Sequence, residues 1–128
     1  MYSIITHNIK VTVMPEYDIK NSYPSDNRFV FRYNIVIENL SNVPVQLIKR
    51  HWLIYDLGFG HSEVTGEGVI GLIPEIKPGE TFNYFSNVIL RSGIGYMQGS
   101  YLMKNLQTQE TFESFIPRFN LISEVIKN

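Results

Sequence analysis

The sequence predicts an all-β protein, an antiparallel sandwich of two sheets with seven or eight strands. Several short segments alternate apolar and polar residues with a period of two, and Gly, Pro, Asn or Ser residues separate them at short intervals. No run of ten or more residues carries a clear helical stripe. Without crossover helices the strands cannot form a parallel sheet, so we expect an immunoglobulin-like sandwich.

The first strands follow from alternation alone. Apolar residues occupy every second position in 9–13 and, most clearly, in 28–38. Pro15, just after the first of these segments, is expected to end that strand. A third alternating segment, 81–88, follows Lys77-Pro78-Gly79-Glu80, which has the proline and glycine positions of a type II turn.

The remaining elements are less regular. Further strands are expected at 45–56, 63–69, 96–103 and 111–115. The first of these changes parity, which a bulge near Lys49-Arg50 would reconcile. Residues 16–27 form the longest polar loop, expected to be the most mobile segment, and 120–127 could form a short terminal helix.

Length and composition fit one globular domain over residues 1–128. Apolar residues make up 44% and charged residues 18%, which is far from the composition of disordered chains. The formal net charge is −1 without a clustered basic excess, so we expect no binding to nucleic acid. The absence of cysteine excludes disulfides, thiolate metal sites and cysteine nucleophiles.

The N-terminal residues lack the basic start and apolar run of a secretory signal, so a cytoplasmic location is expected. The longest uncharged stretch that we find, 92–103, is interrupted by three glycines. A membrane-spanning helix needs about 20 mostly apolar residues. We therefore expect no association with a membrane.

A dense set of motifs in matching order resembles the ApaG family from about Ile9 to about Leu121. The motifs are Tyr33-Asn34-Ile35-Val36-Ile37-Glu38-Asn39, Pro44-Val45-Gln46-Leu47, Arg50-His51-Trp52, Glu63-Val64-Thr65-Gly66-Glu67-Gly68-Val69-Ile70-Gly71, Gly95-Tyr96-Met97-Gln98-Gly99-Ser100-Tyr101-Leu102-Met103 and Ile116-Pro117-Arg118-Phe119. The resemblance implies a fibronectin type III-like sandwich that acts in protein interactions. For some members it also implies a link to cobalt and magnesium resistance.

The glycine motif Gly66, Gly68 and Gly71 matches GxGxxG, and the family has been discussed as a pyrophosphate binder because of it. In dinucleotide-binding folds this motif joins a strand to a helix whose N-terminal amides hold the phosphates. Here apolar residues and Pro74 follow, which favours an extended segment. We therefore expect glycines at a bulge or tight corner, with a helix-free anion nest as the alternative.

Arg50 and His51 are the second candidate anion site, with Arg91 or Arg118 as further contributors. Alternation places Arg50 and Trp52 on one face of the strand and His51 on the other. We expect Trp52 in the core. Arg50 then either packs its stem at the sandwich edge or pairs with a buried carboxylate.

Metal binding and catalysis have weaker support. Asp56, His61 and Glu63 could converge around a hairpin as weak ligands for Mg²⁺ or Co²⁺, but no recognised metal-binding spacing occurs, so we expect no dedicated metal site. No nucleophile elbow or other catalytic motif is found, and we assign no catalytic residue and no cofactor.

The sequence thus predicts a non-catalytic binding or regulatory module whose partner is another protein. Eight tyrosines and eight phenylalanines exceed what the core of such a sandwich needs, and exposed aromatic residues are favoured at interfaces. An open sheet edge could also pair with a second copy to form a homodimer. The alternative is a sensor that binds pyrophosphate, a nucleotide polyphosphate or a divalent cation near Gly66–Gly71.

Overall fold

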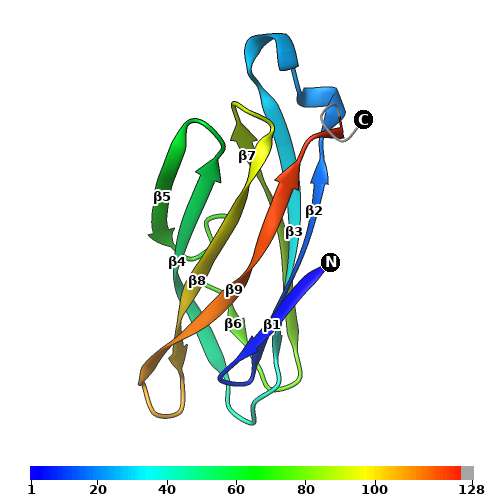
Figure 1. The fold of residues 1–128 in the computed structure, drawn as a ribbon. Coiled ribbons are helices and arrows are strands. Elements are labelled where there is room, and N and C mark those ends of the chain that lie inside the picture. The colour runs from blue at the N-terminus through cyan, green and yellow to red at the C-terminus, as the bar shows by residue number, and fades with distance from the viewer. Residues whose placement is uncertain (125–128) are drawn as a thin grey trace.

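The computed structural model describes residues 1–124 as an elongated sandwich of two antiparallel sheets (Figure 1). Its elements in chain order are β1 (Tyr2–Thr6), β2 (Ile9–Tyr17), the 3₁₀ turns η1 (Ile19–Asn21) and η2 (Pro24–Asp26), β3 (Phe29–Asn39), β4 (Val45–Asp56), β5 (Gly60–Glu67), β6 (Glu75–Ile76), β7 (Thr81–Leu90), β8 (Ile94–Asn105) and β9 (Thr111–Ile122).

One sheet has the strand order β1-β2-β3-β7 and the other has the order β5-β4-β8-β9. β6 pairs with the N-terminal end of β4, at Val45 and Gln46. The predicted antiparallel sandwich is confirmed. The described chain holds nine strands instead of seven or eight, because β1 and β6 were not expected from the sequence. β6 has only two residues, and β1 is mostly exposed, so neither shows the alternation of a half-buried strand.

The core lies between the inner faces of the two sheets. Trp52 is 3% exposed, which confirms its predicted place in the core. Its indole ring makes edge contacts with Tyr33 of the opposite sheet and with Phe119 of β9, at centroid distances of 5.4 and 5.9 Å. These rings join the two sheets at the centre of the sandwich.

Two strand ends differ from expectation. β2 continues through Pro15 to Tyr17. β1 begins opposite Val13, so beyond Val13 β2 has only β3 as a neighbour, and a missing amide is tolerated there. The expected terminal helix at 120–127 is wrong for its first three residues, which complete β9. Long-range pairing with β8 outweighs the local pattern there, and residues 125–128 lie outside the described part.

The bulge and the turn were predicted better than the strand lengths. The expected bulge is present at Ile48, next to the predicted position, where the β4–β8 register shifts between Leu47 and Lys49. The type II turn is confirmed by Gly79 at φ +78° and by the Glu80 amide, which donates to the Lys77 carbonyl at 2.9 Å. The loop before β3 is shorter than expected and contains both 3₁₀ turns.

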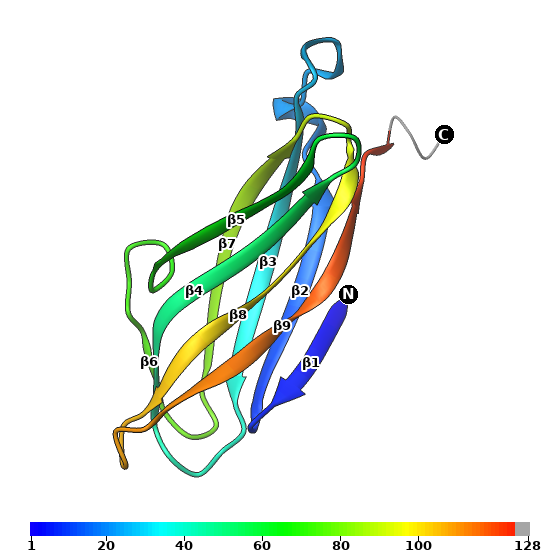
Figure 2. The same cartoon turned by 60° about the vertical axis from the view of Figure 1, so that its left-hand side comes forward.

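The two lateral sides of the sandwich are built differently. On one side β1 packs beside β9 (Figure 2). The Tyr2 ring there lies 6.2 Å from that of Phe119. On the other side the last strands are β7 and β5, and β5 pairs with β4 alone among the described strands. We call these the closed side and the open side.

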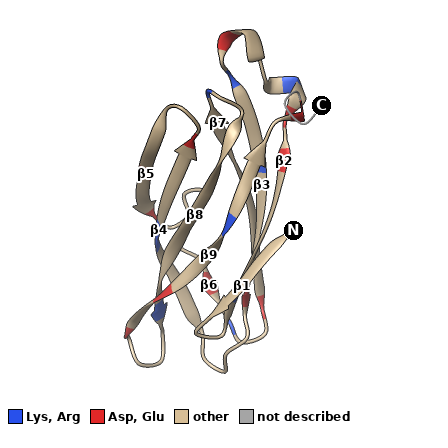
Figure 3. Cartoon of the chain, in the orientation of Figure 1, with Lys and Arg blue, Asp and Glu red and all other residues tan. Residues whose placement is uncertain are grey.

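Basic and acidic residues are spread along the ribbon, and the basic ones do not gather on one strand (Figure 3). Within residues 1–124 the structure has no helix long and apolar enough to cross a membrane.

Candidate functional site

The glycine motif ends β5 and continues into a tight turn on the open side. Val69 and Leu72 exchange both backbone hydrogen bonds, at 2.9 and 2.8 Å, around Ile70 and Gly71 at φ +45° and +76°. Two consecutive positive φ angles in a two-residue loop are those of a type I′ turn. The predicted tight corner is therefore present, whereas the extended segment expected after Gly68 is wrong, because the chain reverses within two residues.

Gly68 is required by close packing as well as by its φ of +53°. A Cβ atom at Gly68 would lie 1.8 Å from the Leu72 carbonyl oxygen, whereas one at Gly71 would meet open space. The amides of Gly68, Val69 and Leu72 donate to carbonyls of the protein itself. These three amides cannot at the same time form an anion nest, and the strand that follows, β6, offers no helix N-terminus.

Arg50 lies beneath this loop, and the buried carboxylate expected as one possible partner for it is not found among residues 1–124. Its Nη1 donates to the carbonyl oxygens of Glu67 and Gly68 at 2.9 and 3.0 Å, and no carboxylate of residues 1–124 forms an ion pair with it. The guanidinium covers Gly66, where a Cβ would lie 2.8 Å from three of its atoms. Backbone carbonyls, and not a buried acid, hold the charge.

A cavity of about 280 Å³ opens beside Arg50 between the two sheets on the open side. The hydroxyl-bearing side chains of Tyr33, Tyr84 and Ser86 line it from β3 and β7, and Ile70 and Val64 border it from the glycine turn and β5. Ile70 is 57% exposed and Val64 is 41% exposed, so these two residues stand at the mouth.

Two buried phenols, Tyr33 and Tyr84, line the cavity, and Tyr84 contacts a third, Tyr101. The hydroxyls of Tyr84 and Tyr101 share a hydrogen bond of 2.5 Å. Burial raises the pKa of Tyr33, Tyr84 and Tyr101, and the Arg50 guanidinium opposes that shift in each pKa. The positive charge of Arg50 therefore acts on all three hydroxyls, which stay protonated at neutral pH.

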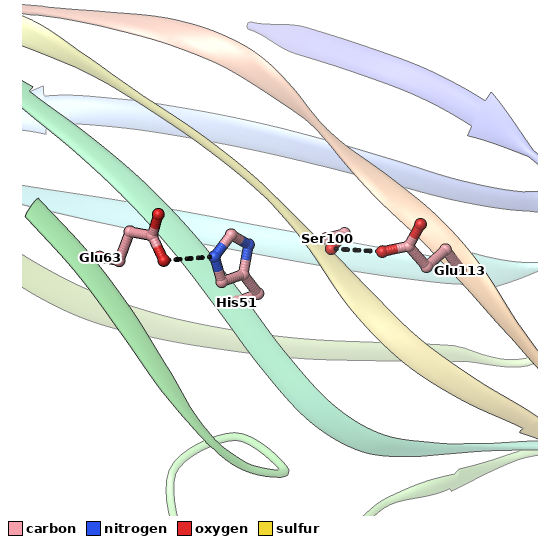
Figure 4. A network of polar contacts seen from close by, with 4 residues as sticks. All are labelled: His51, Glu63, Ser100 and Glu113. Atoms are coloured by element: carbon pink, nitrogen blue, oxygen red, sulfur yellow. Dashed lines mark hydrogen bonds and ion pairs between the residues drawn. The ribbon is translucent and has the colours of Figure 1, made fainter. Parts of the chain in front are cut away.

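His51 faces away from this cavity, as alternation predicts, so the expected anion set is not brought together. It lies on the outer face of the β5-β4-β8-β9 sheet, where its Nε2 is 3.4 Å from a Glu63 carboxylate oxygen. On the neighbouring strands the Ser100 hydroxyl donates to Glu113 at 3.3 Å (Figure 4). Together these four residues form a polar row across the four strands.

A second row on the same outer face is aromatic, and we call it the aromatic row. Tyr55 and Tyr96 stack at 5.2 Å, and the ring of His61 lies 4.7 Å from Tyr55 while its Nε2 is 3.1 Å from the Tyr96 hydroxyl. The Arg118 guanidinium carbon lies 3.7 Å from the Tyr96 ring centre. Each residue comes from a different strand, so the row crosses the whole sheet.

A shallow hollow separates the two rows, and Leu53, Phe115 and Ile4 supply its apolar floor and wall. His51 stands at one margin and Arg118 at the other. Phe115 is 46% exposed, although its ring is large and apolar. The hollow thus combines apolar side chains in its lining with polar side chains at its margins.

The two further arginines do not join Arg50. Arg118 belongs to the aromatic row on the outer face, and the guanidinium carbon of Arg91 lies 5.4 Å from the Phe59 ring centre at the β4–β5 hairpin. The structure therefore leaves Arg50 as the single cation of the cavity lining.

The three weak metal candidates do not converge either. The Asp56 carboxylate accepts hydrogen bonds from the amides of Arg91 and Ser92, at 2.7 and 3.1 Å, and so fixes the turn between β7 and β8. His61 contacts Tyr96, and Glu63 contacts His51. Among the described residues no cluster of three His, Asp or Glu side chains could hold a metal ion.

Comparison with known proteins identifies the family. The ApaG domain (DUF525) model matches residues 19–105. Protein ApaG of Allorhizobium ampelinum is 46% identical over 94% of this chain and 92% of its own, and Protein ApaG of Rhodospirillum centenum is 45% identical over 96% and 94%. A solved structure of a Bordetella pertussis protein described as ApaA superposes with a TM-score of 0.87 at 39% identity, covering 91% of this chain and 94% of that one. The chain therefore belongs to the ApaG family.

Proposed function

We propose that this protein is a cytoplasmic, non-catalytic binding module that docks a segment of another protein on the outer face of the β5-β4-β8-β9 sheet. The hollow between the polar row and the aromatic row is the observation that carries the proposal. The segment places an apolar side chain on Leu53 and Phe115 and a carboxylate beside Arg118.

Rigidity and composition support this surface as the docking site. Apart from Ile4 of β1, its side chains project from four hydrogen-bonded strands, so little conformational entropy is lost when a partner binds. Tyr and Arg are the residue types that most often dominate binding energy, and Tyr55, Tyr96 and Arg118 supply them here. Stacking on Tyr96 orients the guanidinium of Arg118, which forms no ion pair with a carboxylate of residues 1–124.

The surface is also open and lacks the enclosed geometry that a reaction site needs. His51 and Glu63 are 44% and 67% exposed, so water screens their interaction. The indirect role in cobalt and magnesium homeostasis that the family resemblance implies would act through the protein partner. A pyrophosphate sensor in the glycine loop is the less favoured function, because three of the loop amides already donate within the fold.

Site-specific photo-crosslinking tests the proposal. A photoreactive phenylalanine is placed at position 115 and, as the matched control, at position 85, an exposed phenylalanine on the outer face of the other sheet. In cells that make the protein, position 115 should crosslink one protein that position 85 does not. Mass spectrometry then identifies that protein for purification.

Calorimetry with the purified partner completes the test. Phe115→Asp should weaken binding by about ten-fold or more and Phe85→Asp by less than about two-fold, since exposed contacts outside an interface contribute little. Unchanged melting temperatures show that both variants remain folded. Equal losses for the two variants, or crosslinks of the same protein from both positions, would overturn the assignment.

A further inference from the structure

The cavity on the open side contains a combination of groups that the docking surface does not use. It lies between the sheets, on the opposite side of β4 from the hollow. Its walls hold one cationic side chain, Arg50, and the only tryptophan of the chain, Trp52. Both are placed there by the Ile48 bulge, which brings Arg50 and Trp52 onto the inner face.

Arg50 has donors left for a ligand. A guanidinium carries five N–H donors, and its hydrogen bonds to residues 1–124 all come from Nη1. Those bonds fix its plane over Gly66. Since no carboxylate of the described chain neutralises it, a ligand that brings one negative charge would complete the pair.

The rest of the lining is matched to a molecule with an apolar body. Trp52, Val88 and Met97 form the deep wall, and Ile70 covers the mouth. The hydroxyls of Tyr33 and Ser86, which interact with each other, add a polar pair on the β3–β7 wall. A volume of about 280 Å³ is at the small end of ligand pockets, which suits one ring or a short chain.

We propose that this cavity binds a small carboxylic acid with an apolar body, its carboxylate against Arg50 and its body against Trp52, Val88 and Met97. One guanidinium matches the single charge and planar geometry of a carboxylate. A polyphosphate carries several charges and would need more cations than the one in the lining. The site is independent of the docking surface proposed above.

Titration of the full-length protein with phenylacetate tests the inference. Trp52 fluorescence reports binding directly, because it is the only tryptophan and lines the cavity. Phenylacetamide has the same shape without the charge, while phenyl phosphate and pyrophosphate test the other anions. A ligand of about ten heavy atoms typically binds in the millimolar range, so the titration extends to about 10 mM.

We expect phenylacetate to bind at least about ten-fold more tightly than phenylacetamide, because only the acid forms a charge-assisted hydrogen-bonded pair with Arg50. Arg50→Gln should remove that preference. Lys49→Gln, which deletes a positive charge at the exposed neighbouring position, should preserve it. Val64→Phe narrows the mouth, leaves Arg50 in place, and should weaken phenylacetate and phenylacetamide equally.

Several results would overturn the inference. These are equal affinity for the acid and the amide, an unchanged preference in Arg50→Gln, tighter binding of pyrophosphate than of phenylacetate, or no binding of phenylacetate at about 10 mM by both fluorescence and ¹H–¹⁵N spectra. If Arg50→Gln does not fold, Val64→Phe decides: unchanged phenylacetate binding in that variant would also refute the cavity as the site.

Discussion

The closed side and the open side of this sandwich solve the same problem, the end of a double sheet, in different ways. On the closed side Tyr2 packs on Phe119, and side-chain oxygens of β1 reach the β9 backbone, as Thr6 does when it accepts from the Phe115 amide at 3.3 Å. On the open side a glycine turn and a guanidinium border a cavity. The comparison shows that side-chain packing fills the closed side, whereas the open side keeps a cavity lined by polar and apolar groups.

Truncating a large aromatic residue of the core should have the largest effect, and we compare Phe119, which packs on Tyr2 of the closed side, with Trp52, which borders the cavity of the open side. Phe119→Ala and Trp52→Ala should each lower the free energy of unfolding by about 3–5 kcal/mol, the usual range for buried aromatic residues. Trp52→Ala should fall at the lower end, because Trp52 already borders a cavity. Urea denaturation measures both, and a Trp52→Ala variant that is as stable as the wild type would contradict its place in the core.

Alanine at two glycines of the turn should separate packing from backbone strain. Gly68→Ala places a Cβ against the Leu72 carbonyl in addition to its positive φ, so we expect it to destabilise the fold by about 2 kcal/mol or more. Gly71→Ala meets open space and should cost only about 1–2 kcal/mol, the strain of the left-handed conformation. Thermal melting compares them, and equal losses would show that the contact with Leu72 relaxes freely.

High pH should destabilise the open side through its buried tyrosines. The folded pKa of Tyr84 lies above the ordinary value of 10.0, so the folded state holds this proton more tightly than the unfolded state does. The resulting stabilisation is fully present below pH 10 and decreases as the pH rises from there toward the folded pKa.

Urea denaturation between pH 8 and pH 11 measures this effect. The free energy of unfolding should fall less steeply above about pH 10 in Tyr84→Phe than in the wild type, because the variant lacks one hydroxyl whose pKa is raised by folding. Comparing the two proteins cancels the titration of groups that do not interact with Tyr84, whereas Tyr101, whose pKa Tyr84 also raises, contributes to the difference. Parallel slopes would show that Tyr84 ionises as readily in the folded protein as in the unfolded chain.

Replacing the strained turn residue should have the smallest effect, and it should be stabilising. Ile70 is a β-branched residue at φ +45°, and Asn-Gly is the preferred pair in a type I′ turn. Ile70→Asn should therefore raise stability by about 0.5–1 kcal/mol, since relieved strain exceeds the small loss of apolar burial. A lower melting temperature would indicate that the Ile70 side chain contributes more to the mouth of the cavity than its exposure suggests.

The sequence predicts the inner faces well because burial alternates with strand geometry. Phe31 and Ile35 were placed correctly by that rule, and so were Arg50 and His51, on opposite faces of β4. β1 could not be predicted, because it is mostly exposed and its place depends on pairing with β2.

The candidate sites depend on register, which one sequence does not contain. Tyr55, Tyr96 and Arg118 are far apart in the chain, and only the pairing of β4, β8 and β9 makes them neighbours. Their parity within each strand was the available signal, but it does not say which residues stand opposite each other. The cavity was missed for the same reason, since it arises between two sheets.

At the Ile48 bulge the fold depends on the presence of a residue and not on the identity of its side chain. Its carbonyl accepts the Gly68 amide at 2.7 Å, and the Gly68 carbonyl in turn accepts from Arg50. Any residue with a carbonyl oxygen can take the first of these bonds, whereas deletion would leave the amide without its acceptor. In natural variants we therefore expect different amino acids at position 48, but no insertion or deletion next to it.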